Sequence, residues 1–149
     1  MSDAGLAQRL QKWADGKATL KEVRGYTDEE LYSIARTGYF FFYQGKLNEA
    51  RTVFQGLYAI NPLDAYFAKA LGVVEMAAGN PAGAVAAYDV ALKLAPTDPQ
   101  AWLGRAEVKL LQGLKQQALE DLRRGQQHAK PESQEIQKIT ALMQAAMKR

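Results

Sequence analysis

The sequence contains no cysteine and only one histidine, His128. Without cysteine there is no disulfide framework and no thiolate that could act as a nucleophile. A single histidine without cysteine companions supports neither a metal site nor a histidine-activated nucleophile. We therefore predict that the protein is not an enzyme and that it uses no cofactor and no metal.

Long apolar segments are absent too. No run approaches the length that a bilayer-spanning helix requires. The first residues, Met-Ser-Asp-Ala-Gly-Leu, lack the basic and apolar regions of an export signal. The 149 residues are 48% hydrophobic and 23% charged, which is ordinary for one soluble domain. We expect a cytoplasmic protein that does not bind membranes.

The formal net charge is +3, and residues 115–149 carry seven basic and four acidic side chains. A basic segment can contact nucleic acid, and such binding would depend steeply on salt. This segment lacks the dense basic patch and the interleaved aromatic residues of nucleic-acid sites. We favour a solvated helix face and do not expect a nucleic-acid partner.

Four sets of residues recur at a spacing of 34. They are the glycines Gly45, Gly79 and Gly113, the alanines Ala50, Ala84 and Ala118, the large residues Phe54, Tyr88 and Leu122, and the prolines Pro62 and Pro96, with Pro131 one residue late. Each glycine suits a left-handed helix end, and each alanine allows two helices to pack closely. The large residue fills that contact, and the proline ends the unit because it lacks an N–H. A fixed period of this length predicts tandem helical hairpins.

Capping residues predict where the helices begin. Thr27-Asp28-Glu29-Glu30 has the pattern of a capping box, Asn80 precedes a proline suited to the first helical turn, and Thr97-Asp98-Pro99 opens another helix. We predict paired helices over 28–44 and 47–60, 64–78 and 81–94, and 99–112 and 115–128, with further helices over 5–15, 19–24 and 132–147. We expect the stripe of Ile136, Ile139, Leu142, Met143 and Ala146 to cover the last hairpin. The single domain of residues 1–149 then comprises an arm (1–27), three units (28–62, 63–96 and 97–130) and a final helix (131–149).

These units resemble the tetratricopeptide repeat. The first unit matches its signature with Ile34, Thr37-Gly38, Phe41, Ala50, Phe54, Leu57 and Pro62, and the second with Ala68, Leu71-Gly72, Glu75, Ala84, Tyr88, Ala91 and Pro96. The third begins with Trp102 and then departs at Arg105-Ala106, Lys109, Leu122 and Gly125. The resemblance implies an all-α fold in which three hairpins form a short right-handed superhelix, with an N-terminal helical arm and a C-terminal capping helix.

The first helix of each unit should line the concave side of such a superhelix. One stripe per helix is expected to face this groove: Tyr32, Ala35, Tyr39, Phe42 and Tyr43; then Tyr66, Lys69, Val73, Met76 and Ala77; then Gln100, Leu103, Glu107, Leu110 and Leu111. Glu75 stands where the repeat usually has an aromatic residue, so we expect it at the groove edge or simply exposed.

The five consecutive aromatic residues over 39–43 cannot all enter a core, because successive helical residues point about 100° apart. We expect Phe40 and Phe41 to pack between helices and the other three to face the groove. Tyrosine offers apolar area and a hydroxyl at low entropic cost, which suits a peptide-binding wall. The alternative is that the stripe packs against the N-terminal helix.

One tetratricopeptide specialism grips a C-terminal carboxylate with lysine, asparagine and arginine side chains. The matching positions here hold Ala35 and Tyr39 in the first unit and Gln100 and Gly104 in the third. Such a clamp needs converging donors, and these are missing. An apolar groove instead suits an extended segment with apolar or proline anchors.

The chain resembles, more narrowly, the class II chaperones of bacterial type III secretion, which guard translocator proteins. The resemblance is carried by Gly16-Lys17-Ala18-Thr19-Leu20, Gly25-Tyr26-Thr27-Asp28-Glu29-Glu30, Leu31-Tyr32, Gly38-Tyr39-Phe40 and Gln44-Gly45-Lys46. It implies that the groove binds a proline- and leucine-containing segment of a hydrophobic translocator. It also implies homodimers through the N-terminal arm and, in some members, co-activation of a transcription regulator.

Two alternatives stay open at the level of sequence. The chain could be a chaperone for needle subunits or a generic tetratricopeptide adaptor in another assembly. The apolar stripe of the first helix, formed by Leu6, Leu10 and Trp13, could either form the dimer interface or cap the first hairpin.

Overall fold

The computed structural model describes residues 3–148, and within that range the chain forms nine helices and no strand. The helices are α1 (Asp3–Ala14), α2 (Leu20–Arg24), α3 (Asp28–Tyr43), α4 (Leu47–Ile60), α5 (Ala65–Ala77), α6 (Pro81–Leu94), α7 (Pro99–Leu111), α8 (Lys115–His128) and α9 (Gln134–Met147). None of the helices in the described range is long and apolar enough to cross a membrane.

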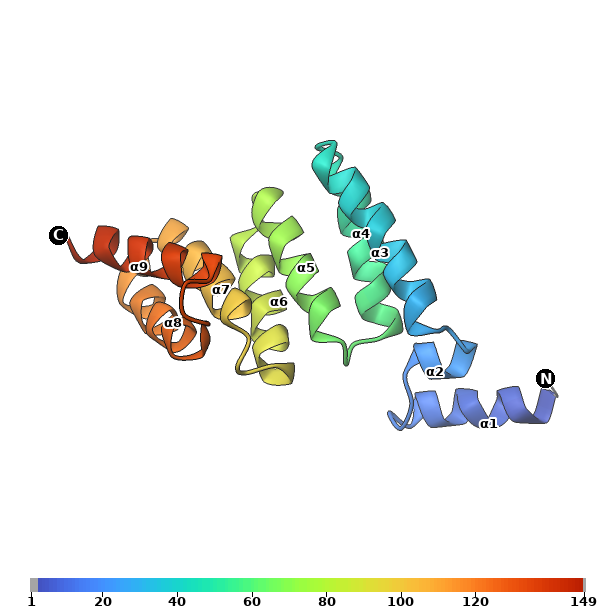
Figure 1. Ribbon diagram of the computed structural model, residues 1–149. Coiled ribbons are helices and arrows are strands. Elements are labelled where there is room, and N and C mark those ends of the chain that lie inside the picture. Colours follow the sequence, from blue (N-terminus) through green and yellow to red (C-terminus); the bar gives the residue numbers. More distant parts are fainter. Residues whose placement is uncertain (1–2, 149) are drawn as a thin grey trace.

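Three helical hairpins, α3–α4, α5–α6 and α7–α8, stack side by side along the molecule (Figure 1). The short helices α1 and α2 lie at one end of the row, and α9 packs on α8 and α7 at the other. The predicted all-α architecture of tandem hairpins with an N-terminal arm and a C-terminal capping helix is confirmed.

The predicted helix ends agree with the observed caps. Thr27 and Glu30 form the capping box, since the Thr27 side chain accepts from the Glu30 N–H and the Glu30 carboxylate accepts from the Thr27 N–H. The Asn80 side chain caps α6 by accepting from the Gly83 N–H at 3.1 Å. The three glycines of the 34-residue period have φ angles of 76°, 79° and 78°, a left-handed conformation that disfavours any side chain.

The repeated small and large residues form the core of each hairpin. Ala50, Ala84 and Ala118 are each 0% exposed, and Phe54 is fully buried beside the first of them. The third unit departs from the pattern at Gly125, and the departure has a packing reason. A Cβ at this position would lie 3.0 Å from Ile139 Cδ1, so glycine lets α9 approach closely.

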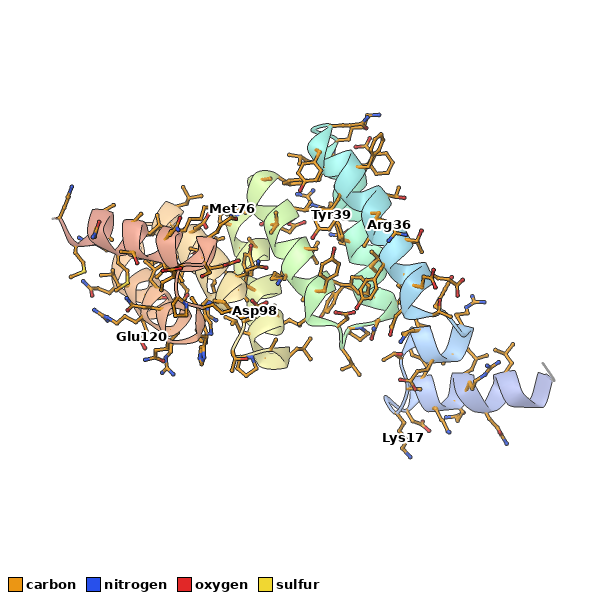
Figure 2. All side chains as sticks on the ribbon, in the orientation of Figure 1. Lys17, Arg36, Tyr39, Met76, Asp98 and Glu120 are labelled. Carbon is orange, nitrogen blue, oxygen red and sulfur yellow. The ribbon has the colours of Figure 1, made fainter. Side chains whose placement is uncertain are left out.

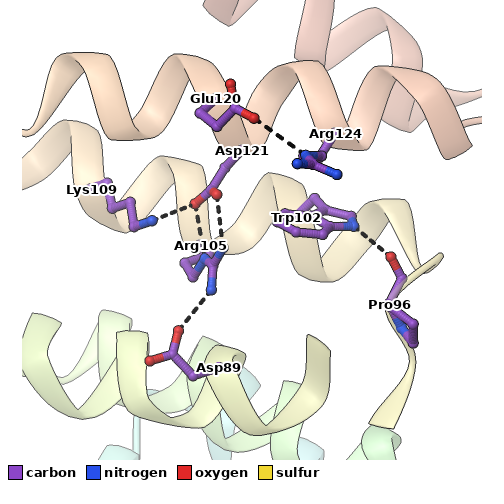
Figure 3. A network of polar contacts seen from close by, with 8 residues as sticks. All are labelled: Asp89, Pro96, Trp102, Arg105, Lys109, Glu120, Asp121 and Arg124. Carbon is purple, nitrogen blue, oxygen red and sulfur yellow. Dashed lines mark hydrogen bonds and ion pairs between the residues drawn. The ribbon is translucent and has the colours of Figure 1, made fainter. Parts of the chain in front are cut away.

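An ion network centred on the buried Asp121 joins the second and third hairpins (Figure 3). Arg105 on α7 donates to both carboxylate oxygens of Asp121 on α8, at 2.8 and 2.9 Å, and to Asp89 on α6 at 2.8 Å. Lys109 also contacts Asp121 at 2.9 Å. The Asp121 side chain is only 3% exposed. Its hydrogen bond is the largest of the influences that raise the pKa of Arg105.

Two expectations about packing are wrong. Glu75 is buried rather than at the groove edge, and it accepts from Arg51 Nε at 2.5 Å and from Asn80 Nδ2. Phe40 does not pack between helices but is 61% exposed. Its counterparts one and two periods later, Val74 and Val108, are buried because a preceding hairpin covers them. No hairpin precedes α3, so Phe40 stays uncovered.

The N-terminal arm covers the first hairpin only in part. The short helix α2 packs on α4 and buries Val23, whereas α1 packs mainly on α2 and projects away from the row of hairpins (Figure 1). The apolar stripe of α1 is left open, with Leu6, Leu10 and Trp13 exposed by 39%, 43% and 47%. Capping by α1 is therefore not the arrangement seen, and the dimer interface stays a prediction.

Candidate peptide-binding groove

A cavity of about 640 Å³ runs along the first helices of the hairpins. Its walls come mainly from α5, α7 and the N-terminal half of α9, with one tyrosine from α3 and one from α6. The lining residues are Tyr39, Lys69, Ala70, Val73, Met76, Tyr88, Gln100, Leu103, Gly104, Glu107, Gln134, Glu135, Gln137 and Lys138. Figure 2 shows Tyr39 among the side chains that lie between α3 and α5, and Met76 on the side of α5 that faces α9. We call this cavity the groove.

Aromatic rings continue from the groove toward the start of α3. The Tyr39 ring lies 6.2 Å from that of Tyr66 and 5.0 Å from that of Phe54, measured between centroids. The Tyr66 ring in turn meets Tyr32 edge to face at 5.6 Å. Such pairs add to the stability that burial provides and hold the rings in fixed orientations. The tyrosines therefore form a firm wall that extends the groove beyond α5.

The hydroxyls of Tyr32 and Tyr39 in this wall are protonated at neutral pH. The Asp64 carboxylate, which accepts from the Tyr32 hydroxyl at 2.7 Å, raises the pKa of Tyr32 to about 12. Burial, followed by a hydrogen bond with Tyr66, raises the pKa of Tyr39 above its ordinary value. Both hydroxyls thus remain neutral hydrogen-bonding groups.

The opposite side of the groove is polar, and successive hydrogen bonds connect its side chains. Lys69 donates to Asp98 at 2.8 Å and to Gln100 at 2.9 Å. Gln100 donates to Glu135 on α9 at 2.9 Å, and this bond is the main reason why the pKa of Glu135 lies below its ordinary value. The Lys69 contacts join α5 to the start of α7, and the Gln100–Glu135 bond joins α7 to α9, so the three helices of the groove wall are linked.

The floor of the groove contains Tyr88, which comes from the second helix of its hairpin. The ring is 3% exposed and lies between two glycines of the neighbouring first helices. A Cβ at Gly72 would lie 2.9 Å from the ring, and one at Gly104 would lie 2.5 Å from Oη. Only glycine at positions 72 and 104 leaves room for the Tyr88 side chain to extend between the two helices to the groove floor.

Seven of the fifteen stripe residues predicted to face the groove line this cavity. They are Tyr39, Lys69, Val73, Met76, Gln100, Leu103 and Glu107. Tyr32 and Tyr66 are each 38% exposed and lie outside the cavity, on the aromatic wall that continues from it. A peptide that extends beyond the cavity toward α3 would meet both. Contact of these nine residues with a peptide stays a prediction.

The remaining six predicted residues lie elsewhere. Ala77 and Leu111 are exposed near the ends of their helices, outside the cavity. Ala35 is 1% exposed and belongs to the first core cluster, because its methyl group is too short to pass the side chains of α5. Phe42 is half-buried against the same core. Leu110 packs under α9 in the third core cluster. Tyr43, the last residue of α3, is 81% exposed and does not line the cavity.

Ala70, Tyr88, Gly104 and the whole wall contributed by α9 are not among the groove residues that the repeat predicts. For α9 a signal was present, because one more step of the period leads from Gln100 to Gln134 and from Leu103 to Gln137. The helix thus occupies the place that the first helix of a fourth unit would take. For Tyr88 there was no signal, since its large-residue position is filled by packing residues in the other units.

Comparison with known proteins identifies the repeat family and shows which solved structures share the fold. The sequence matches the tetratricopeptide repeat family over residues 36–99 and again over 76–133. No curated protein matches the sequence. Among solved structures, the chain is similar to the type III secretion translocator chaperone SycD of Yersinia enterocolitica, with a TM-score of 0.81 and 23% identity, covering 86% of this chain and 98% of that one.

Two further structures carry bound peptide segments. PcrH, known from Pseudomonas aeruginosa, in complex with the chaperone binding region of PopD has a TM-score of 0.76 and 21% identity, covering 82% of this chain and 94% of that one. The first tetratricopeptide domain of Spaghetti (RPAP3), bound to an HSP90 peptide, has a TM-score of 0.73 and 17% identity, covering 80% of this chain and 92% of that one. At these identities the similarity establishes a shared fold.

Proposed function

The chain belongs to the tetratricopeptide repeat family, and from this premise we propose that it is a cytoplasmic chaperone of a bacterial type III secretion system. Its groove binds an extended, apolar, proline-containing segment of a translocator protein. Binding keeps that membrane-inserting partner soluble and unassembled before secretion.

The observation that carries the proposal is the composition of the groove. Val73, Met76 and Leu103 form its apolar part, and Tyr39 adds an aromatic side. Val73 is 36% exposed, so this surface is open to a ligand. Apolar pockets next to a row of aromatic side chains suit an extended segment with spaced apolar anchors. The similarity to SycD and to PcrH with its PopD segment supports a translocator as the source of that segment.

Recognition of a free C-terminal carboxylate, as in chaperone-tail peptides, fits this groove poorly. Two lysines line it, Lys69 and Lys138. Lys69 is paired with Asp98 at 2.8 Å, and Lys138 lies 4.0 Å from Glu107. A carboxylate clamp needs donors that converge on the ligand. Here the cations are engaged by acidic neighbours on the walls.

Co-expression tests the proposal. We expect a translocator with paired membrane-spanning segments, encoded next to this chain, to accumulate in the soluble fraction with the chain and to aggregate without it. The two proteins should co-purify. A partner that is equally soluble alone, or that stays insoluble and unbound beside abundant folded chaperone, would contradict the proposed function.

A further inference from the structure

The Tyr88 hydroxyl has an environment unlike that of any other tyrosine in the described part of the chain. It lies at the groove floor next to Gly104, and both residues line the groove. The residue as a whole is 97% buried, since its exposure is 3%. A buried side chain whose polar atom faces a cavity is placed to meet whatever fills that cavity.

Packing alone does not require this hydroxyl. The equivalent positions in the other two hairpins hold Phe54 and Leu122, which fill the same contact without a polar atom and are each 0% exposed. Gly72 also has a counterpart in the first hairpin, Gly38. A Cβ added at Gly38 would lie 2.8 Å from Phe54 Cε2. A phenyl ring between glycine and the next helix is thus sufficient for the fold.

Gly104 is the feature specific to this place. Its equivalents one and two periods earlier are Ala70 and Arg36, so the period does not impose glycine here. A Cβ at residue 104 would lie 2.4 Å from Tyr88 Cζ and 2.5 Å from Oη. The chain therefore has a hydroxyl where the fold needs none, and a glycine that makes room for it.

No described residue accepts or donates a hydrogen bond at the Tyr88 hydroxyl. Desolvation by burial, with a smaller effect of the Glu107 charge, raises the pKa of Tyr88 to about 12. The group is therefore a protonated donor at neutral pH. The oxygen itself is not fully buried, so it is open to the groove, and a ligand that supplies an acceptor takes the place of water there.

We propose that Tyr88 Oη donates a hydrogen bond to a main-chain carbonyl of the extended segment that binds in the groove. The main-chain carbonyls of an extended segment make no hydrogen bonds within the segment, so they need donors from the groove. Each proline in the segment also removes one N–H donor, so its carbonyl acceptors outnumber its donors. The adjacent apolar surface of Val73 and Leu103 provides no donor. The assignment rests on the proposed function, and it makes Tyr88 a residue that fixes the position of the bound main chain.

The test uses the full chain and a panel of synthetic 12-residue peptides, blocked at both ends, which combine leucine and proline at varied spacings. Binding is measured by fluorescence anisotropy. Tyr88→Phe should weaken the Kd of the best-binding peptide roughly 5- to 10-fold, as expected for loss of one neutral hydrogen bond. The matched control, Tyr58→Phe, removes a hydroxyl on α4 outside the groove and should leave the Kd unchanged.

A second readout separates a bond to the ligand from a structural effect. Replacing single peptide carbonyls by thioamides, which are weaker acceptors, should reveal one position at which Tyr88→Phe has no further effect. Equal binding by wild type and Tyr88→Phe, or a loss of the same size at every thioamide position, would overturn the assignment. Failure of the whole panel to bind wild type would instead contradict the proposed function, and this inference with it.

Discussion

Replacing Val73 by aspartate is expected to abolish binding of the apolar segment while the chain stays folded. Val73 lines the groove on α5 and is 36% exposed, so a carboxylate there remains hydrated in the free protein. A bound apolar segment would remove water from that charge, and the neighbouring cation of Lys69 is already paired with Asp98, so binding would cost several kcal/mol. We expect the Kd to rise by about 100-fold or more. The measurement is a titration of the purified variant with the partner segment.

The control for this variant is Gln55→Asp, which places the same charge on an exposed position of α4 outside the groove. It should bind like wild type. Both variants should retain the helical circular-dichroism spectrum and a similar melting temperature. Unchanged binding by the Val73 variant would show that the ligand occupies another surface.

Replacing Asp121 by alanine is expected to destabilise the fold more than any surface charge removal. The Asp121 carboxylate is 3% exposed and accepts from Arg105 and Lys109, whose side chains are 18% and 13% exposed. Its loss leaves Arg105 paired with Asp89 alone, and it removes the ion-pair partner that Lys109 has among the described residues. Breaking a buried pair in this way costs about 3 kcal/mol, which corresponds to a fall in melting temperature of about 6–12 °C for a chain of this size.

The matched control is Glu120→Ala, one residue earlier on the same helix. Glu120 is 55% exposed and pairs with Arg123 and Arg124 at 3.6 and 3.3 Å. Exposed pairs contribute about 0–1 kcal/mol, so this variant should unfold almost like wild type. Urea denaturation followed by circular dichroism compares the two. Equal free energies of unfolding for both variants would show that the network around Asp121 does not stabilise the stacked hairpins.

The helices were predictable because local chemistry determines their ends. The capping box at Thr27, the proline after Asn80 and the left-handed glycines act through neighbouring backbone groups, and each is readable within a few residues. The predicted helix over 47–60 is α4 to the residue. The third unit was also recognisable from the sequence. Its departure from the repeat at Gly125 is explained by the close approach of α9, which the period does not specify.

The groove was only partly predictable, because a helical stripe indicates which way its side chains point but not how far each one extends. Ala35 and Lys69 occupy the same position in successive units, yet the alanine ends in the core and the lysine extends to the groove. Phe40 and Val74 likewise share a position, and the difference in exposure comes from the hairpin that precedes one and not the other. Tyr88 reaches the groove from a second helix through a gap left by distant glycines. Such outcomes depend on neighbours that the period does not specify.

Site-specific photocrosslinking from the groove tests the central claim most directly. A photoreactive phenylalanine analogue is placed at Val73 or, as the control, at Gln55, and the chain is co-expressed with its membrane-inserting partner. We predict that the groove position crosslinks to one short apolar, proline-containing segment of the partner, mapped by mass spectrometry, and that the control position does not. Crosslinks of equal yield from both positions, or crosslinks from Val73 that scatter over the partner or map to a polar segment, would contradict the account.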